Sequence, residues 1–129
     1  MKIRKIDYNS HEFKKVMKDS PTGLIIFNEK ADYYCTHKDN EIISICGIVK
    51  YKKGYKIVTL FTYEEYRKKH IMAGMIEHLI SKYGANYYYA NANENSFRIF
   101  KRLGFEEKSF TQFKFFNRRV MILSLLTIT

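Results

Sequence analysis

The sequence predicts an α+β domain, a mixed α/β sandwich in which a twisted, mostly antiparallel sheet with one parallel strand pair is flanked by about three helices. Strand-like segments rich in β-branched and aromatic residues follow one another in residues 31–62 and again in residues 108–126. A long helical pattern at residues 66–84 lies between strand-like segments. A strand–helix–strand order implies a right-handed crossover, which supplies the one parallel pair.

The first half of the chain is expected to be a strand, a helix and a three-strand meander. Ser10 is a suitable N-cap for the first helix, and Pro21 and Gly23 follow it as breakers. The last strand of the meander is expected to be central, because apolar residues fill both of its faces. The expected elements are strand 2–6, helix 10–20, a short strand or ordered loop at 23–27, and strands 31–37, 41–51 and 55–62.

The second half begins with the long helix, whose apolar residues recur with the 3.6-residue period between Ile71 and Tyr83 and whose C-cap is Gly84. A strand, a short helix and a final strand pair follow. These elements are expected at 86–92, within 93–104 and within 108–126. No repeat or linker interrupts the sequence, so we expect a single domain over residues 1–129.

Composition limits the classes of function. The formal net charge is +10, with 11 Tyr, 10 Phe and no Trp, and such a balance favours anionic partners. Cys35 and Cys46 lie on one expected hairpin and could be close, but reduced thiols are the better interpretation, and no spacing suggests a metal site. The first residues lack the apolar core of a signal peptide, and the apolar tail is too short to cross a bilayer. We therefore expect a cytoplasmic protein with no membrane partner.

The long helix begins with four basic or potentially basic residues, Arg67, Lys68, Lys69 and His70. A helix N-terminus already carries partial positive charge and unpaired N–H groups, so cations there cost stability unless an anion is present. One interpretation is an anion site, which a pyrophosphate would suit. The other is a solvated basic turn that Glu64 and Glu65 partly neutralise.

Two segments resemble the motifs of the GCN5-related N-acetyltransferase (GNAT) superfamily. "YRKKHIMAG" at residues 66–74 is similar to the cofactor turn of that family, and "NENSFRIFKRLGF" at residues 93–105 is similar to its second signature. The resemblance covers residues 42–123 and implies a GNAT fold, acetyl-CoA as cofactor and N-acetyltransferase activity. The resemblance implies a small, divergent member of that superfamily. Both segments also resemble, more loosely, phage-encoded members that serve as internal virion proteins, which would place the protein in the host cytoplasm or the virion.

The resemblance also implies the residues that would bind the cofactor. The backbone of one splayed strand would hold the pantetheine arm, the helix start would bind the pyrophosphate, and the turn before the last helix would contact the pantetheine. The implied cofactor-binding residues are Leu60, Phe61, Thr62, Arg67, Lys68, Lys69, His70, Ile71, Met72, Ala73, Asn93 and Ser96.

Several positions depart from the family pattern. His70 and Met72 stand at the positions of the two glycines in the family's cofactor turn, and their side chains are expected to narrow the phosphate site. His70 either donates to a phosphate or blocks the site. Phe100 stands where the family has the Tyr that protonates the leaving thiolate, and Lys56 stands where one branch has a Glu base. The catalytic residue is therefore unknown. Glu64, Tyr88 and Tyr89 are candidates, although the tyrosines also suit ordinary strand positions.

The leading interpretation is an acetyl-CoA-dependent N-acetyltransferase whose acceptor amine attacks the thioester directly. The positive charge favours an acidic or nucleic-acid-linked acceptor over a polycation, and a homodimer is left open. Two alternatives remain at this point. One is a catalytically degenerate GNAT-like structural or interaction protein, and the other is a basic nucleic-acid-binding module, for which binding would weaken steeply with salt.

Overall fold

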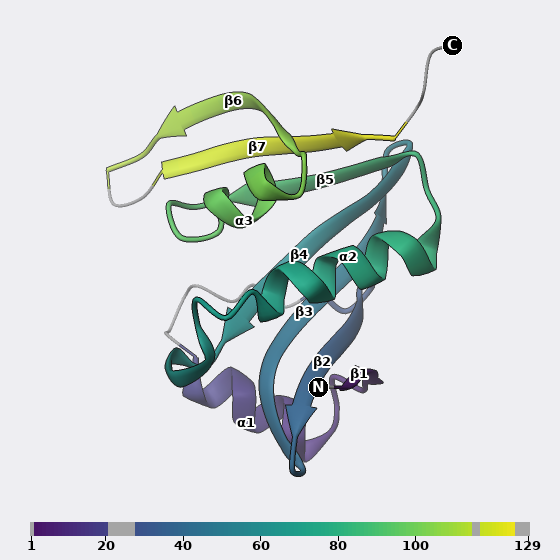
Figure 1. The fold of residues 1–129 in the computed structure, drawn as a ribbon, viewed down its shortest axis with the longest axis vertical. Coiled ribbons are helices and arrows are strands. Elements are labelled where there is room, and N and C mark those ends of the chain that lie inside the picture. Colours follow the sequence, from purple (N-terminus) through teal and green to yellow (C-terminus); the bar gives the residue numbers. More distant parts are fainter. Residues whose placement is uncertain (1, 21–27, 115–116, 126–129) are drawn as a thin grey trace.

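The computed structural model describes residues 2–20, 28–114 and 117–125, which form a seven-stranded sheet with helices on both faces (Figure 1). The strand order is β1-β2-β3-β4-β5-β7-β6, and every neighbouring pair is antiparallel except β4 and β5. The predicted α+β class and its single parallel pair are confirmed. The strands are β1 (Lys2–Ile6), β2 (Asp32–Lys38), β3 (Glu41–Tyr51), β4 (Gly54–Thr62), β5 (Tyr87–Ala92), β6 (Glu106–Gln112) and β7 (Asn117–Ser124); the helices are α1 (His11–Asp19), α2 (Ile71–Tyr83) and α3 (Phe97–Arg102).

The sheet buries a separate hydrophobic core on each face. Alternation along β2 divides its side chains between them, so that Tyr33 and Cys35 pack with α1 while Tyr34 packs with α2. The larger core also includes α3 and the buried faces of β5 and β7. Apolar residues on both faces make β4 a central strand, as its composition predicts.

The two cysteines point to opposite faces of the sheet. In the β2–β3 register Cys35 is paired with Ile45, and Cys46 is paired with Tyr34. These two pairs are adjacent, and the side chains of adjacent pairs point to opposite faces of a sheet. Both thiols are free and buried, and burial raises the pKa of the Cys46 thiol to about 12. The expected reduced state agrees with this arrangement. The prediction for residues 23–27 lies outside the described residues.

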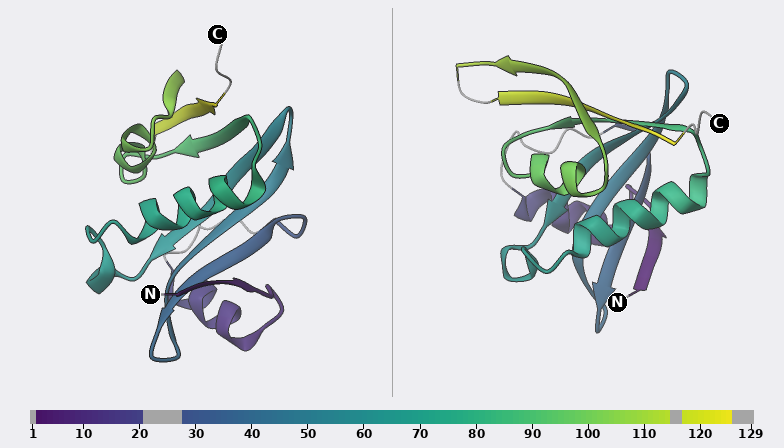
Figure 2. Two further views of the ribbon diagram at one scale, coloured as in Figure 1. Left: turned by 45° about the vertical axis from the view of Figure 1, so that its right-hand side comes forward. Right: turned by 45° about the horizontal axis from the view of Figure 1, so that its top comes forward.

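The parallel strands β4 and β5 are paired at one end only. Their register runs from Tyr55 opposite Tyr88 to Ile57 opposite Ala90, and beyond that pair the strands diverge (Figures 1 and 2). The paired end is held very close: a Cβ on Gly54 would lie 1.9 Å from the carbonyl oxygen of Tyr87. Glycine at position 54 therefore permits the close approach from which the two strands open.

Helix α2 connects β4 to β5 and covers the divergence. It begins on the side where the strands have separated and runs back toward their paired end, and α3 lies beside β5 on the open side (Figure 1). Gly84 ends α2 in a left-handed conformation with φ 62°, as the C-cap prediction requires. Within the described residues, no helix combines the length and apolar character needed to cross a bilayer.

Candidate functional site

The divergence of β4 from β5 creates an opening in the sheet whose edge is the last part of β4. This part contains Leu60, Phe61 and Thr62, which continue β4 beyond its last pairing with β5 at Ile57. A strand that leaves its neighbour presents backbone N–H and C=O groups on the vacated side, and these groups bind extended ligands well. The three residues named from the resemblance therefore lie at the opening.

A bulge in β4 accompanies the divergence. Gly47 of β3 pairs with Val58 and Ile45 pairs with Phe61, so β4 contains one residue more than β3 between these pairs. Thr59 lies in the bulge with a left-handed φ of 55°, which is strained for a β-branched side chain. Strained backbone concentrates at functional sites, where the surrounding fold holds it in place.

The first turn of α2 faces this region without a side-chain cap. The helical hydrogen bonds begin with the N–H of Gly74 donating to the carbonyl of His70, at 3.1 Å, and no side chain accepts from the turn before it. Helix α1 differs, because the Ser10 hydroxyl accepts from the N–H of Phe13 there. The uncapped N–H groups of α2, which belong to Ile71, Met72 and Ala73, are thus available to an anion.

The basic residues before α2 have no acidic partners in the described part of the chain. Arg67 donates from its Nε to the carbonyl oxygen of Thr62 at 2.8 Å, which joins this turn to the end of β4. The Lys69 amine lies 5.6 Å from the centre of the Tyr66 ring. Neither Glu64 nor Glu65 forms an ion pair with these cations, although both are close in sequence. These two carboxylates therefore make no direct ion pair with the basic residues before α2, and partial neutralisation of the turn by them would act through solvent at longer range.

His70 and Met72 occupy the helix start differently from what their sizes suggest. His70 adopts a left-handed conformation, φ 59°, of the kind that glycine adopts without strain, and its imidazole contacts the Arg102 side chain at the end of α3. Met72 is only 5% exposed and belongs to the larger core. The expectation that both side chains narrow the phosphate site fails for Met72, because its side chain is directed into the core.

Asn93 and Ser96 shape the turn between β5 and α3. The side-chain oxygen of Asn93 accepts the N–H groups of Asn95 and Ser96, each at 2.9 Å. The Ser96 hydroxyl accepts the N–H of Asn93 at 3.1 Å. Both predicted residues therefore lie at the open side of β5, where their first role is to fix this turn.

The acid–base candidates are spread over the molecule. Phe100 is fully buried, with its ring centre 5.0 Å from that of Phe105. The Tyr88 hydroxyl donates to the carbonyl of Ile80, near the C-terminal end of α2, which lies about 15 Å along the helix from His70 at 1.5 Å per residue. Burial is the main cause of the raised pKa of Tyr88.

Two other positions face the opposite side of the sheet from α2. The Tyr89 ring contacts the Tyr51 ring at 5.1 Å, and the Lys56 amine lies 5.1 Å from the centre of the same Tyr51 ring. Glu64 is exposed in the 3-10 turn Glu64–Tyr66 that follows β4. The structure therefore brings neither Tyr88 nor Tyr89 to the opening, and Glu64 is the candidate that remains close to the end of β4 in the chain.

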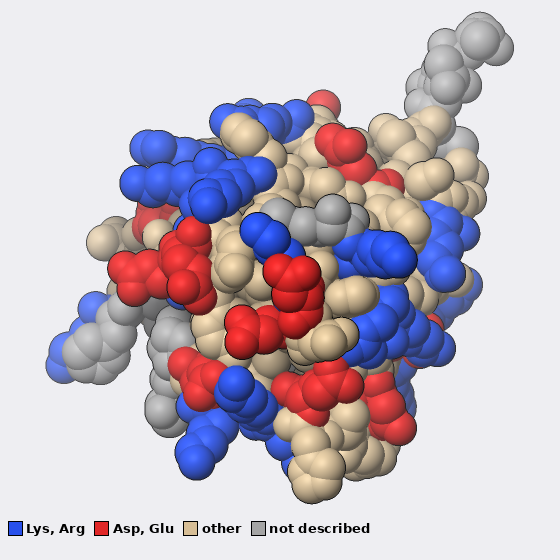
Figure 3. Space-filling model, turned by 60° about the horizontal axis from the view of Figure 1, so that its bottom comes forward, with Lys and Arg blue, Asp and Glu red and all other residues tan. Residues whose placement is uncertain are grey.

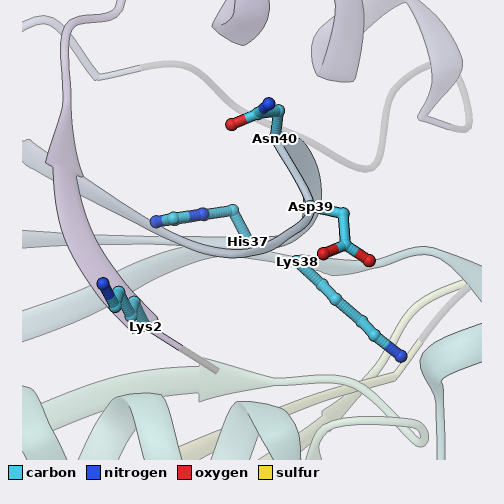
Figure 4. A pocket seen from close by; sticks show the side chains of 5 residues that line it. All are labelled: Lys2, His37, Lys38, Asp39 and Asn40. Atoms are coloured by element: carbon cyan, nitrogen blue, oxygen red, sulfur yellow. The ribbon is translucent and has the colours of Figure 1, made fainter.

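Two other surface features of the described residues are a hollow at the β2–β3 turn and a face with mixed charge (Figure 3). A shallow hollow at the β2–β3 turn is lined by Lys2, His37, Lys38, Asp39 and Asn40, whose side chains do not converge on a common point (Figure 4). On the face drawn in Figure 3, Lys and Arg side chains gather in patches that Asp and Glu side chains separate. That face is therefore not one continuous basic surface.

The sequence interpretation missed two features of the site. Arg102 was not expected there, because its contact with His70 joins residues 32 positions apart. The left-handed Thr59 was also not expected, because nothing in the strand "YKIVTLFT" distinguishes that residue. The family's glycine at the position of His70 was the one available signal of a left-handed backbone.

The fold and this site agree with one family. Residues 4–117 match the family described as "Acetyltransferase (GNAT) domain", and the chain belongs to it. No curated protein sequence matches the chain.

Solved structures share the fold at low sequence identity. The aminoglycoside 6'-N-acetyltransferase from Enterococcus faecium has a TM-score of 0.75 at 12% identity, over 100% of this chain and 99% of that chain. A Bacillus subtilis acetyltransferase in complex with CoA has a TM-score of 0.75 at 16% identity, over 96% and 98% of the two chains. A GNAT family acetyltransferase from Elizabethkingia anophelis with acetyl-CoA bound has a TM-score of 0.71 at 10% identity, over 96% and 97%. These likenesses establish the fold.

Proposed function

We propose that the protein is an acetyl-CoA-dependent N-acetyltransferase. The observation that carries the proposal is the meeting of two features: the opening between β4 and β5, and the uncapped, basic start of α2 beside it. One feature suits an extended arm and the other suits a pyrophosphate, and CoA contains both groups. Membership of the GNAT family and the fold shared with CoA-bound acetyltransferases support the same cofactor.

Each part of the site has a role in this proposal. The backbone of Leu60, Phe61 and Thr62 binds the pantetheine arm, and Asn93 and Ser96 border the arm from the β5 side. The residues Arg67, Lys68, Lys69, His70, Ile71, Met72 and Ala73 form the start of α2, whose backbone N–H groups bind the pyrophosphate. Arg67 is already fixed to the end of β4 through the Thr62 carbonyl, so its charge lies where the two parts meet.

The reaction is a direct transfer, for which acetyl-CoA supplies an acyl group activated as a thioester. The neutral acceptor amine attacks the carbonyl carbon, a C–N bond forms, the C–S bond breaks, and the thiolate leaves with the electron pair. The amine loses a proton to solvent or to a nearby carboxylate such as Glu64, and the thiolate gains one from water. Phe100 has no proton to donate, so the rate depends on the orientation of amine and thioester.

The absence of a Tyr at position 100 lowers the expected rate without removing activity. A positioned acid typically contributes about 10²–10⁴-fold, while orientation alone supplies several kcal/mol. The net charge of +10 supports an acceptor amine on an acidic or nucleic-acid-linked molecule. We also propose that the protein acts in the cytoplasm as one domain over residues 1–129.

The test is release of CoA thiol from acetyl-CoA in the presence of amines of different charge, with the wild type, Arg67→Gln and Lys38→Gln. Both variants remove one exposed positive charge, but Lys38 lies at the β2–β3 turn, away from α2. We expect Arg67→Gln to raise the KM for acetyl-CoA several-fold and Lys38→Gln to leave it unchanged. No thiol release above the uncatalysed rate with any amine, together with no cofactor binding, would overturn the proposal.

A further inference from the structure

A contact between two helices crosses the open side of the site. Nη1 of Arg102, at the end of α3, donates to Nδ1 of His70 at the N-cap of α2, and it lies 3.4 Å from the other imidazole nitrogen. A guanidinium has only donors, so the imidazole nitrogen is the acceptor. The guanidinium is therefore held beside the first turn of α2, the end at which the uncapped N–H groups lie.

Arg102 has no carboxylate within ion-pair distance among the residues that the structure describes. Arg119 on β7 is different, since it pairs with Glu107 at 3.0 Å and with Glu94 at 3.4 Å, and it lies against the rings of Phe97 and Phe110. Arg119 is thus used within the fold. Arg102 is exposed and keeps most of its donors for other partners.

The lysine next to Arg102 points elsewhere. Lys101 acts electrostatically on Glu106 of β6, where it helps to lower the pKa of that carboxyl after the larger effect of Lys108. Adjacent helical residues are turned by about 100° from each other, so Arg102 faces α2 while Lys101 faces β6. The two side chains carry the same charge on one short helix and differ in direction, which makes Lys101 a matched control.

The left-handed backbone at His70 explains how the contact arises. A side chain at this position is expected to stand over the helix start and to compete with a phosphate. Here the imidazole instead reaches α3 and binds Arg102. His70 therefore fills the glycine position of the family and adds a positioned guanidinium, whose planar fork suits phosphate oxygens.

We propose that Arg102 is a ligand of the cofactor's pyrophosphate and that His70 is the residue that positions it. This inference rests on the proposed function, because it assumes that CoA binds at the start of α2. It deepens that function by assigning a second phosphate-binding element, the end of α3, to the site.

The test compares the binding of CoA, dephospho-CoA and pantetheine by calorimetry to the full chain. Dephospho-CoA lacks the 3'-phosphate but keeps the pyrophosphate, and pantetheine lacks both. We expect Arg102→Gln to weaken CoA and dephospho-CoA equally, by about tenfold or more, since charge-assisted hydrogen bonds to phosphate are lost. Pantetheine binding should not change, and Lys101→Gln should alter none of the three by more than about twofold.

His70 is tested by rescue and by a double mutant. His70→Ala should weaken CoA binding less than Arg102→Gln does, and His70→Gln, which keeps an acceptor, should restore part of the loss. The double variant His70→Ala, Arg102→Gln should bind no more weakly than Arg102→Gln alone, because the two residues act as a unit. Additive losses would overturn the positioning role of His70.

Four results would overturn the role of Arg102. Tighter CoA binding by Arg102→Gln would show that the contact with His70 obstructs the site. A loss for CoA without a loss for dephospho-CoA would move the contact to the 3'-phosphate. An equal loss in Lys101→Gln would reduce the effect to general charge. Arg102→Lys keeps the charge without the fork, and full affinity in that variant would contradict a ligand with defined geometry.

If the wild type binds none of the three molecules, the proposed function fails, and this inference fails with it.

Discussion

The left-handed residues at the start of α2 make a direct prediction about stability. Lys68 and His70 have φ of 64° and 59°, and each L-residue in this conformation costs about 1–2 kcal/mol that glycine does not pay. Glycine in turn loses about 0.5–1 kcal/mol of backbone entropy on folding. Lys68→Gly should therefore stabilise the protein by about 0.5–1 kcal/mol, which corresponds to a rise of about 2–4 °C in Tm.

His70→Gly tests the same strain together with the contact to Arg102. Relief of the left-handed backbone again contributes about 0.5–1 kcal/mol, but loss of the hydrogen bond from Arg102 removes about the same amount. The expected net change is close to zero. The difference between Lys68→Gly and His70→Gly then measures the net value of the imidazole–guanidinium contact.

The assay is urea unfolding of the wild type and the two variants, with linear extrapolation of the free energy of unfolding. Lys69→Gly serves as the control, because Lys69 is flanked by the two left-handed residues but has no positive φ itself. That variant should be destabilised or unchanged. A destabilised Lys68→Gly, or a Lys69→Gly as stable as Lys68→Gly, would refute the left-handed geometry at this helix start.

Three further predictions concern the strand opening, the tyrosine network and the chemistry. Gly54→Ala should destabilise the protein by more than about 2 kcal/mol in thermal unfolding, because the added Cβ would lie 1.9 Å from the Tyr87 carbonyl oxygen. Gly74→Ala is the control: nothing lies within 4 Å of its added Cβ, so this variant should be stabilised by about 0.5–1 kcal/mol. A well-folded Gly54→Ala variant would contradict the close β4–β5 junction. Burial, followed by the hydrogen bonds with Tyr34 and Asp32, raises the pKa of Tyr83, so folding favours the protonated phenol. The contribution of Tyr83 to the stability of the fold is therefore complete below about pH 10 and is lost as the pH rises above that value. Tyr83→Phe should therefore lower the free energy of unfolding by about 1–2 kcal/mol at pH 7. In urea unfolding between pH 7 and 11, the variant should also lose less stability at alkaline pH than the wild type does. An equal alkaline loss in the two proteins would count against this network. Because Phe100 has no proton to donate, kcat/KM should rise with pH as the acceptor amine deprotonates and then stay level, and a descending alkaline limb would reveal an acid elsewhere in the site.

Local patterns account for most of the fold. The 3.6-residue period of α2, its C-cap at Gly84 and the hairpins β2–β3, β3–β4 and β6–β7 depend on neighbours in sequence, so they can be predicted without a structure. The parallel pair follows from the strand–helix–strand order, since the crossover rule leaves one arrangement. The face of the sheet to which each cysteine side chain points could not be predicted from the sequence. It depends on the pairing register of β2 and β3, and a shift of one residue moves a side chain to the other face.

The site was readable only where it lies within one segment. The basic start of α2 and the turn at Asn93 are continuous in sequence, and both were named from their motifs. The contact of Arg102 with His70 depends on how α3 packs beside α2, which no local pattern specifies. The direction of Tyr88 could not be chosen among three consecutive tyrosines, because strand alternation gives opposite faces without saying which face is buried.

The central claim is that the opening between β4 and β5 and the start of α2 together bind CoA. The most direct measurement is calorimetric titration of CoA and acetyl-CoA into three proteins. These are the wild type, the double variant that carries both Arg67→Ala and Lys69→Ala, and the control Lys38→Gln. We predict micromolar binding by the wild type and the control, and at least about tenfold weaker binding by the double variant, because it lacks two charges that the proposal places beside the phosphates. No binding by the wild type, or equal binding by the double variant, would contradict the claim.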